Sequence, residues 1–194
     1  MQSTARARSS REERLILGVD RAIYHVARHW IWLLNTVGTV FVLLPFLAPV
    51  LMAEGHATLA GMIYRPFHLI CHQLPYRSFH ILGYKMAYCE RDFAIYTGLL
   101  VLGLLYGASK RRIRPATVRE VVFLSLPIAV DGFTQLFGWR ESTWELRVVT
   151  GSIFAVAVAW LVYPRLETGF GEIAATVEAR FEHLVREGRV APLH

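Results

Sequence analysis

An almost uninterrupted apolar stretch runs from about Trp30 to Met52, and it constrains this chain more than any other feature of the sequence. A helix needs about 20 predominantly apolar residues to cross a hydrocarbon core about 30 Å thick. The stretch meets that length, and Pro45 and Pro49 are expected to bend its outer third. The chain is therefore predicted to be an integral membrane protein.

Three further apolar blocks follow, each less uniform than the first. Together they predict membrane spans at about 30–52, 87–108, 116–138 and 147–163. The last span is expected to stop at Pro164, because proline cannot continue the hydrogen bonding of a helix. The expected fold class is therefore all-α, a bundle of about four transmembrane helices. With 194 residues, 54% of them hydrophobic, the chain has room for one small bundle.

Basic residues flank the apolar blocks, and their placement predicts the orientation in the cell membrane. They precede the first span and join the second span to the third, and short loops rich in such residues stay cytoplasmic. The residues are Arg6, Arg8, Arg11, Arg14, Lys110, Arg111, Arg112 and Arg114. Both termini of a multi-pass protein are then cytoplasmic, and the loop at 53–86 faces outward. The net charge of +6 is explained by this placement, so no nucleic-acid partner is expected.

Both ends of the chain are predicted to be amphipathic cytoplasmic segments outside a transmembrane domain at 29–164. Apolar residues recur at helical spacing within 1–28 and within 165–194. Such helices are typical of the membrane surface, and docking onto a partner subunit is the alternative. Small residues at four-residue spacing within the spans are interpreted as packing faces. They are Gly103, Gly107, Gly151, Ala155 and Ala159.

Ionisable residues occur at a similar depth in three of the predicted spans. A rise of 1.5 Å per residue places Asp92, Asp131 and Arg147 roughly 24 to 27 Å from the cytoplasmic boundary. An ionisable group at this depth costs about 2.5 kcal/mol or more unless it pairs or reaches water. The three side chains are therefore expected to face the bundle interior together. An ion-pair network that only locks the bundle explains this pattern as well as a functional site does.

In the functional interpretation, the polar residues of the outer face form one site. Asp131 or Glu141 would act as a general base there. The expected substrate-binding residues are Gln73, Arg77, Gln135, Arg140 and Arg147. A lipid-linked or envelope substrate would fit this location, but the sequence names no reaction, and whether the chain is an enzyme stays open.

Both cysteines of the chain lie on the predicted outer side. Cys71, His72, Cys89 and Asp92 could bind zinc, which takes thiolate, imidazole and carboxylate ligands in tetrahedral geometry. Cys89 and Asp92 lie one helical turn apart, whereas the adjacent Cys71 and His72 are harder to aim at one ion. A Cys71–Cys89 disulfide is the competing interpretation, because an oxidising compartment would allow these cysteines to pair. Two free buried thiols and a noncovalent heme are further alternatives.

Two motifs lie between about residues 62 and 160. One reads Cys71-His72-Gln73-x-Pro75-x-Arg77-Ser78-Phe79, followed by Gly83 and by Cys89-x-Arg91-x-x-x-Ile95-Tyr96-x-Gly98. The other reads Asp131-Gly132-x-Thr134-Gln135, then Arg140-Glu141-Ser142-Thr143 and Leu146-Arg147-x-x-Thr150-Gly151. Together they resemble a prokaryotic family of membrane proteins known as domain of unknown function 2085. The resemblance implies a shared outer-face site and no particular substrate. Members of that family often have a cysteine where Asp92 stands here.

Two functions from different classes remain open. The first is a membrane protein with an outer-face polar site that holds zinc. The second is a noncatalytic subunit of a larger membrane complex, in which a Cys71–Cys89 disulfide is structural. The lipid bilayer is the expected partner in both, and other membrane subunits or further copies of the chain are expected in the second. A small transporter is less suited, because four short helices leave little room for alternating access.

Overall fold

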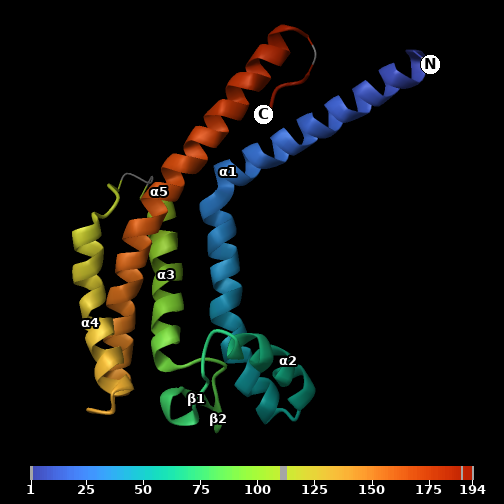
Figure 1. Ribbon diagram of the computed structural model, residues 1–194. Helices are drawn as coiled ribbons and strands as arrows, with labels where there is room; N and C mark the ends of the chain where they lie inside the picture. Colours follow the sequence, from blue (N-terminus) through green and yellow to red (C-terminus); the bar gives the residue numbers. More distant parts are fainter. Residues whose placement is uncertain (1, 110–112, 189, 194) are drawn as a thin grey trace. The chain divides into compact units, whose positions relative to one another are not determined.

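Helices make up most of the protein. The computed structural model describes residues 2–109, 113–188 and 190–193, with side chains from residue 13 onward. In chain order the helices are α1 (Gln2–Ala53), α2 (Ala57–His68), α3 (Glu90–Ala108), α4 (Val118–Leu136) and α5 (Trp144–Arg186). A 3-10 turn (Pro75–Arg77) and a two-stranded antiparallel hairpin, β1 (His80–Ile81) and β2 (Tyr84–Lys85), lie between α2 and α3 (Figure 1). The predicted all-α membrane fold is confirmed.

The chain forms two compact units. The larger unit is Leu34–Pro164, and the smaller unit combines Met1–Leu33 with Arg165–His194. Each end of the chain is helical, but as a continuation of α1 or α5 and not as a separate helix. Pro164 lies inside α5, so the helix does not end there as predicted, whereas the predicted exit from the membrane at this residue stays a prediction.

Three helices are long and apolar enough to cross a membrane within the part of the chain that the structure describes. They are Glu13–Ala53, Glu90–Ala108 and Trp144–Arg186, and they contain most of the predicted spans at 30–52, 87–108 and 147–163. The fourth predicted span corresponds to α4, which has 19 residues, as α3 does. Its charged residues Arg119, Glu120 and Asp131 lie toward both ends of the helix, whereas the three charged residues of α3 all lie in its first turn. Whether α4 also crosses the membrane therefore stays a prediction.

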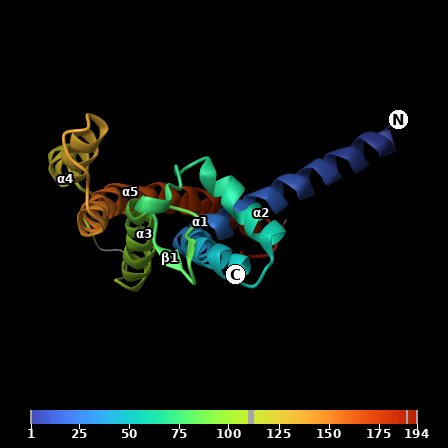
Figure 2. The ribbon, with the colours of Figure 1, turned by 90° about the horizontal axis from the view of Figure 1, so that it is seen from below.

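Small residues allow α3 to pack closely against its neighbours in the larger unit. A Cβ atom added at Gly98 of α3 would stand 2.7 Å from the Cβ of Ala155 in α5. One added at Gly151 of α5 would stand 2.8 Å from the backbone oxygen of Arg91 in α3, and Gly103 lies directly against Asn35 of α1. Within this unit α4, α5, α3 and α1 stand in that order, side by side (Figures 1 and 2). The predicted packing role of Gly103, Gly151 and Ala155 is confirmed.

Two prolines inside helices help to fix the loops. Proline has no backbone N–H, so Pro49 and Pro164 each leave the carbonyl four residues earlier without its helical donor. The backbone N–H of Ala87 donates to the oxygen of Pro45 over 3.5 Å, and that of Ala116 donates to the oxygen of Trp160 over 3.2 Å. This explains why α5 continues through Pro164. It also ties the segments before α3 and α4 to neighbouring helices.

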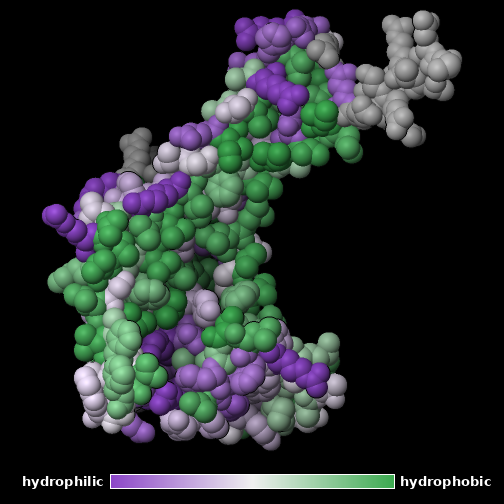
Figure 3. Space-filling view, in the orientation of Figure 1, coloured by the Kyte–Doolittle hydropathy of each residue, from purple (hydrophilic) through white to green (hydrophobic). Residues whose placement is uncertain are grey.

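Polar residues gather at one end of the larger unit, which we call the loop end. It comprises the segment 54–89 between α1 and α3 and the connection 137–143 between α4 and α5. Figure 3 shows hydrophobic side chains over the middle of the larger unit and hydrophilic ones at this end. A buried cluster anchors the segment 54–89 to α1, with Ala48 of α1 beside Phe67, Cys71, Met86, Ala87, Tyr88 and Cys89.

In the smaller unit, the two ends of the chain pack against each other. Tyr24 and Ala27 from α1 and Ala174 from α5 form its core. Trp30 Nε1 donates a hydrogen bond to Glu167 over 2.8 Å, and the ring of Trp30 stacks on Phe170. The amphipathic ends therefore bury part of their apolar faces together. Their predicted contact with a membrane surface or a partner subunit stays a prediction.

Candidate functional site

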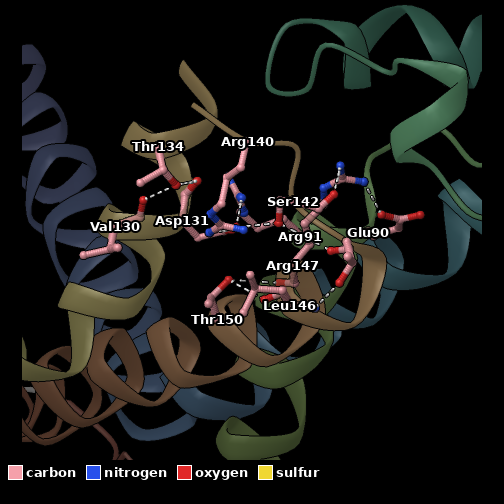
Figure 4. Close-up of polar contacts among 11 residues, drawn as sticks. Glu90, Arg91, Val130, Asp131, Thr134, Arg140, Ser142, Leu146, Arg147 and Thr150 are labelled. Carbon is pink, nitrogen blue, oxygen red and sulfur yellow. Dashed lines mark hydrogen bonds and ion pairs between the residues drawn. The ribbon is translucent and has the colours of Figure 1, made fainter. Parts of the chain in front are cut away.

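The carboxylate of Asp131 joins three elements at the loop end. Asp131 lies near the end of α4 and is 1% exposed. Arg140 Nη2 donates to its Oδ1 over 2.7 Å, and Ser142 Oγ donates to its Oδ2 over 2.9 Å. Arg91 Nη2 of α3 also donates to Oδ2 (Figure 4). Two guanidinium groups and a hydroxyl thus compensate a buried negative charge, which would otherwise cost several kcal/mol.

A second buried ion pair lies beside the first. Arg147 Nη1 of α5 donates to Glu90 Oε2 of α3 over 2.8 Å, and Arg147 Nη2 donates to the backbone oxygen of Ser142 over 2.5 Å. Ser142 therefore contacts both ion pairs, through its hydroxyl and through its carbonyl (Figure 4). We call Glu90, Arg91, Asp131, Arg140, Ser142 and Arg147 the ion-pair network. It connects α3, α4 and α5.

The structure brings together a different set of charges from the expected three. Asp131 and Arg147 belong to the ion-pair network, whereas Asp92 contacts Cys89 instead. Their partners Glu90 and Arg91 were not singled out as site residues. The available signal was their position directly before Asp92 in the first turn of a predicted span, where unpaired charges are costly.

The predicted catalytic residues lie in very different surroundings. Both oxygens of Asp131 accept hydrogen bonds from Arg91, Arg140 and Ser142, which suits an anion that holds other groups in place. Glu141 is exposed on the connection after α4. The structure does not bring these two carboxylates into contact through any interaction of the described residues. A role for either as a general base stays a prediction.

A second cluster at the loop end contains both cysteines. The Sγ atoms of Cys71 and Cys89 and a carboxylate oxygen of Asp92 all lie within 4.8 Å of one another. The backbone N–H of Cys89 donates to Cys71 Sγ over 3.0 Å, and the Cys89 thiol donates to Asp92 Oδ2 over 3.2 Å. Both cysteines are buried free thiols, so the structure does not support the alternative of a disulfide. We call these three residues the thiol–carboxylate cluster.

His72 does not join this cluster. Its side chain is largely exposed, and its Nδ1 accepts a hydrogen bond from the backbone N–H of Leu74 over 3.2 Å. The remaining ring nitrogen, Nε2, is not within the group of donor atoms that the structure brings together among the described residues. The predicted set of four ligands is thus reduced to three, and a part for His72 would require movement of the loop.

Local backbone geometry places the two cysteines. Cys89 is the N-cap of α3 with an extended backbone, so Asp92 follows one turn later on the same side. Gln73 has a φ of 50°, a left-handed conformation that turns the chain just after Cys71. The buried side chain of Gln73 donates to the backbone oxygen of Tyr64 over 2.8 Å. Lys85 Nζ donates to the backbone oxygen of Gln73 over 2.5 Å. Gln73 therefore holds this turn, and its predicted role in binding substrate stays a prediction.

Burial and nearby groups shift the pKa values of two loop residues, Cys71 and His72. The contact with Cys89 and burial both raise the pKa of the Cys71 thiol, so the two sulfurs do not ionise together without a compensating cation. Partial burial and then the positive charge of Arg77 lower the pKa of His72. The charge of Asp92 opposes this effect on the pKa of His72, and the charges of Arg147 and Arg91 add to it.

The remaining predicted substrate-binding residues frame the loop end. The Arg77 guanidinium lies 5.2 Å from the ring centre of Tyr76, and it forms no ion pair with any residue whose side chain is described. The Arg140 side chain is 38% exposed although it pairs with Asp131. Gln135 lies one turn after Asp131, and its buried Nε2 lacks a hydrogen-bond acceptor within the described part of the chain.

Comparison with known proteins now places the chain in a family. The family described as "predicted membrane protein (DUF2085)" matches residues 71–161. A Methanocaldococcus jannaschii protein is 40% identical over 132 residues, which cover 64% of this chain and 85% of that protein. This chain belongs to the DUF2085 family. A Methanothermobacter thermautotrophicus relative is 36% identical over 100 residues, covering 52% of this chain and 90% of the relative. No solved structure matches the chain.

Membership of the DUF2085 family and the apolar helices identify a membrane protein in contact with the lipid bilayer. The matched segment begins at Cys71 and ends within α5. It therefore contains the whole thiol–carboxylate cluster and the whole ion-pair network. Both relatives carry the name "uncharacterized protein", so they assign no activity to these residues.

Proposed function

We propose that this chain is a multi-pass protein of the cell membrane that binds a zinc ion through Cys71, Cys89 and Asp92 on the outer face. The observation that carries the proposal is the position of three donor atoms of suitable chemistry within 4.8 Å of one another. Zinc binds thiolate and carboxylate ligands at about 2.0 to 2.3 Å, so small side-chain adjustments would complete the coordination. Three protein ligands leave the fourth position for water.

The position of Cys89 favours its thiolate, which is the form that binds zinc, whereas the Cys71 thiol would lose its proton only on binding the ion. Cys89 stands at the N-terminus of α3, where the helix dipole stabilises negative charge. The backbone N–H of Cys89 that donates to Cys71 Sγ would continue to support the sulfur once the metal is bound. The Cys89 thiol donates a hydrogen bond to Asp92, and zinc would take the place of that proton, which would be released to solvent.

A zinc site of this kind would suit an enzyme. Zinc with an open position activates a bound water or polarises a phosphoryl or carbonyl oxygen. A substrate that is linked to lipid or belongs to the cell envelope would reach a site on the outer face. Within this proposal, Asp131 positions Arg91 and Arg140 through its ion pairs, and the exposed Glu141 is the remaining candidate for a general base.

The outward orientation of the loop end follows from the distribution of basic residues. Cytoplasmic loops carry an excess of lysine and arginine, and this chain has several such residues before α1's apolar part and between α3 and α4. The loop end lies at the opposite ends of these helices. A cysteine introduced at this end by His80→Cys tests the orientation. It should react with a membrane-impermeant thiol reagent added to intact cells if the loop end faces outward.

Metal analysis of the full chain, purified gently in detergent, tests the zinc site. We expect about one zinc per chain in the wild type and little in Cys71→Ser, Cys89→Ser or Asp92→Asn, since each removes one of three ligands. Glu145→Gln is the control, because Glu145 is exposed at the same end of the protein. Thiol labelling on the same samples, before and after reduction, reports the state of the cysteines.

Zinc-free wild type that stays free of metal after zinc is added would overturn the proposal. If its thiols then react only after reduction, the cysteines form a disulfide in the cell. That result would favour the noncatalytic subunit of a larger membrane complex, which should co-purify with its partners.

A further inference from the structure

We infer that the loop end binds a phosphoryl group through Arg77, Arg91 and Arg147, beside the thiol–carboxylate cluster. A phosphoryl group would then be the part of the substrate that the proposed site recognises. The inference rests on that proposed function. The phosphoryl group would belong to a free phosphate monoester or to a lipid with a phosphomonoester headgroup, because both present the same tetrahedral oxyanion. The inference depends on the charge and on the unsatisfied hydrogen-bond donors of the loop end.

The guanidinium groups of the loop end outnumber the carboxylates that neutralise them. Arg91 and Arg140 share the single charge of Asp131, and Arg147 pairs with Glu90. Arg77 forms no ion pair with a described residue, as noted above. The third carboxylate, Asp92, accepts its hydrogen bond from Cys89 and forms no ion pair with these arginines. The four guanidinium groups therefore retain a net positive charge, which an anion would balance.

The unsatisfied polar atoms among these residues are all hydrogen-bond donors. The Nε–H groups of Arg77, Arg91 and Arg147 are enclosed and have no acceptor among the described residues, and the same is true of Gln135 Nε2. A buried donor without a partner costs about 1 to 3 kcal/mol, so such groups are rare unless a water or an ion supplies the acceptor. Because these groups are donors only, their partner has to supply acceptor atoms, as the oxygens of a phosphoryl group do.

The donors come from different elements that meet at the loop end. Arg147 of α5 donates to Glu90, the residue before Arg91 in α3. Arg77 lies two residues before Phe79, whose ring centre is 5.5 Å from that of Phe93 in α3 and 6.1 Å from that of Trp144 in α5. Arginine binds phosphate with two parallel hydrogen bonds, and several such groups around one centre suit a tetrahedral oxyanion better than a planar carboxylate. Arg91 is 22% exposed, which leaves a route from solvent.

Calorimetric titration of the zinc-treated full chain in detergent tests the inference. The probes are inorganic phosphate and dihexanoyl phosphatidic acid, with chloride at equal ionic strength as the reference. We expect Arg77→Gln to weaken binding about tenfold or more, because it removes a charged hydrogen-bond donor. Arg65→Gln is the matched control, since Arg65 is an exposed residue of α2 with the same charge and no described contact.

Binding of either phosphate probe that is weakened in Arg77→Gln and unchanged in Arg65→Gln supports the inference. Binding of the lipid alone identifies a headgroup as the source, and binding of both identifies the phosphoryl group itself. Equal affinity in the two variants, or no binding above the chloride reference, overturns it. Zinc content measured on the same samples separates this failure from that of the proposed function, because Arg77→Gln leaves all three zinc ligands in place.

Discussion

Arg147 of α5 donates a hydrogen bond to Glu90 of α3 over 2.8 Å, and neither side chain is more than 9% exposed. The pair lies at the loop end of a bundle whose helices also meet through small residues such as Gly98, Gly151 and Ala155. Charges so far from water are stable together because each compensates the desolvation of the other. The pair therefore helps to set the position of α3 relative to α5.

Breaking this pair should destabilise the protein strongly. Arg147→Met should cost about 3 to 5 kcal/mol, because it leaves the charge of Glu90 buried without a partner. Unfolding in mixed detergent micelles, followed by circular dichroism, measures the change. Adding Glu90→Leu to Arg147→Met should restore most of the loss, since an apolar pair of similar volume avoids both desolvation costs. A double variant as unstable as the single one would contradict this account.

Asp131→Asn should also destabilise the larger unit while leaving zinc binding intact. The amide keeps the shape of the carboxylate, but it cannot neutralise Arg91 and Arg140, so we expect a loss of about 2 to 4 kcal/mol. The same unfolding assay and metal analysis would measure both properties. Glu145→Gln, at an exposed position, should change stability by less than about 0.5 kcal/mol. Loss of zinc in Asp131→Asn would show that zinc binding by the thiol–carboxylate cluster depends on the ion-pair network.

The close approach of α3 and α5 predicts a rescue experiment. Gly98→Ala would place a methyl group 2.7 Å from the Cβ of Ala155, so the helices must separate. We expect a destabilisation of about 1 to 3 kcal/mol, as for other overpacked sites. Ala155→Gly in the same chain should recover much of it, because it removes the atom that clashes. Gly61→Ala serves as the control, since nothing lies within 4 Å of an added Cβ there.

Zinc should raise the thermal stability of the full chain if the thiol–carboxylate cluster binds it. A ligand at about 100 times its dissociation constant stabilises the folded state by about 2.7 kcal/mol. Thermal unfolding with and without a chelator measures the difference. Cys89→Ser should show little response to zinc, whereas the Glu145→Gln control should respond as the wild type does. An equal response of Cys89→Ser and the wild type would place the zinc elsewhere.

Much of the architecture could be predicted from local patterns. The apolar stretch at 30–52 indicated a membrane helix because its length matches the bilayer, and that helix is present within α1. The small residues Gly151 and Ala155 indicated a packing face, since only small side chains let two helices approach closely. The helix boundary at Pro164 was predicted wrongly, because a tertiary hydrogen bond from Ala116 takes the carbonyl of Trp160 that the proline leaves free.

The candidate site required more than local patterns. Sequence spacing placed Asp92 on the turn that follows Cys89, but it could not show that Cys71 would reach them or that His72 would face away. That outcome depends on the left-handed backbone of Gln73 and on the hydrogen bonds that hold the loop against Tyr64. Such bonds join residues distant in the chain, so no local pattern contains them.

The sequence by itself determined that this chain is helical and belongs in a membrane, because apolar length and periodicity are properties of consecutive residues. It also determined that the charged residues near the helix ends need partners, because isolated charges are costly there. Only the tertiary structure decided which residues are the partners of these charges. Asp131 pairs with Arg91 and Arg140, and Arg147 pairs with Glu90, because the packing of three helices sets which side chains come within hydrogen-bonding distance.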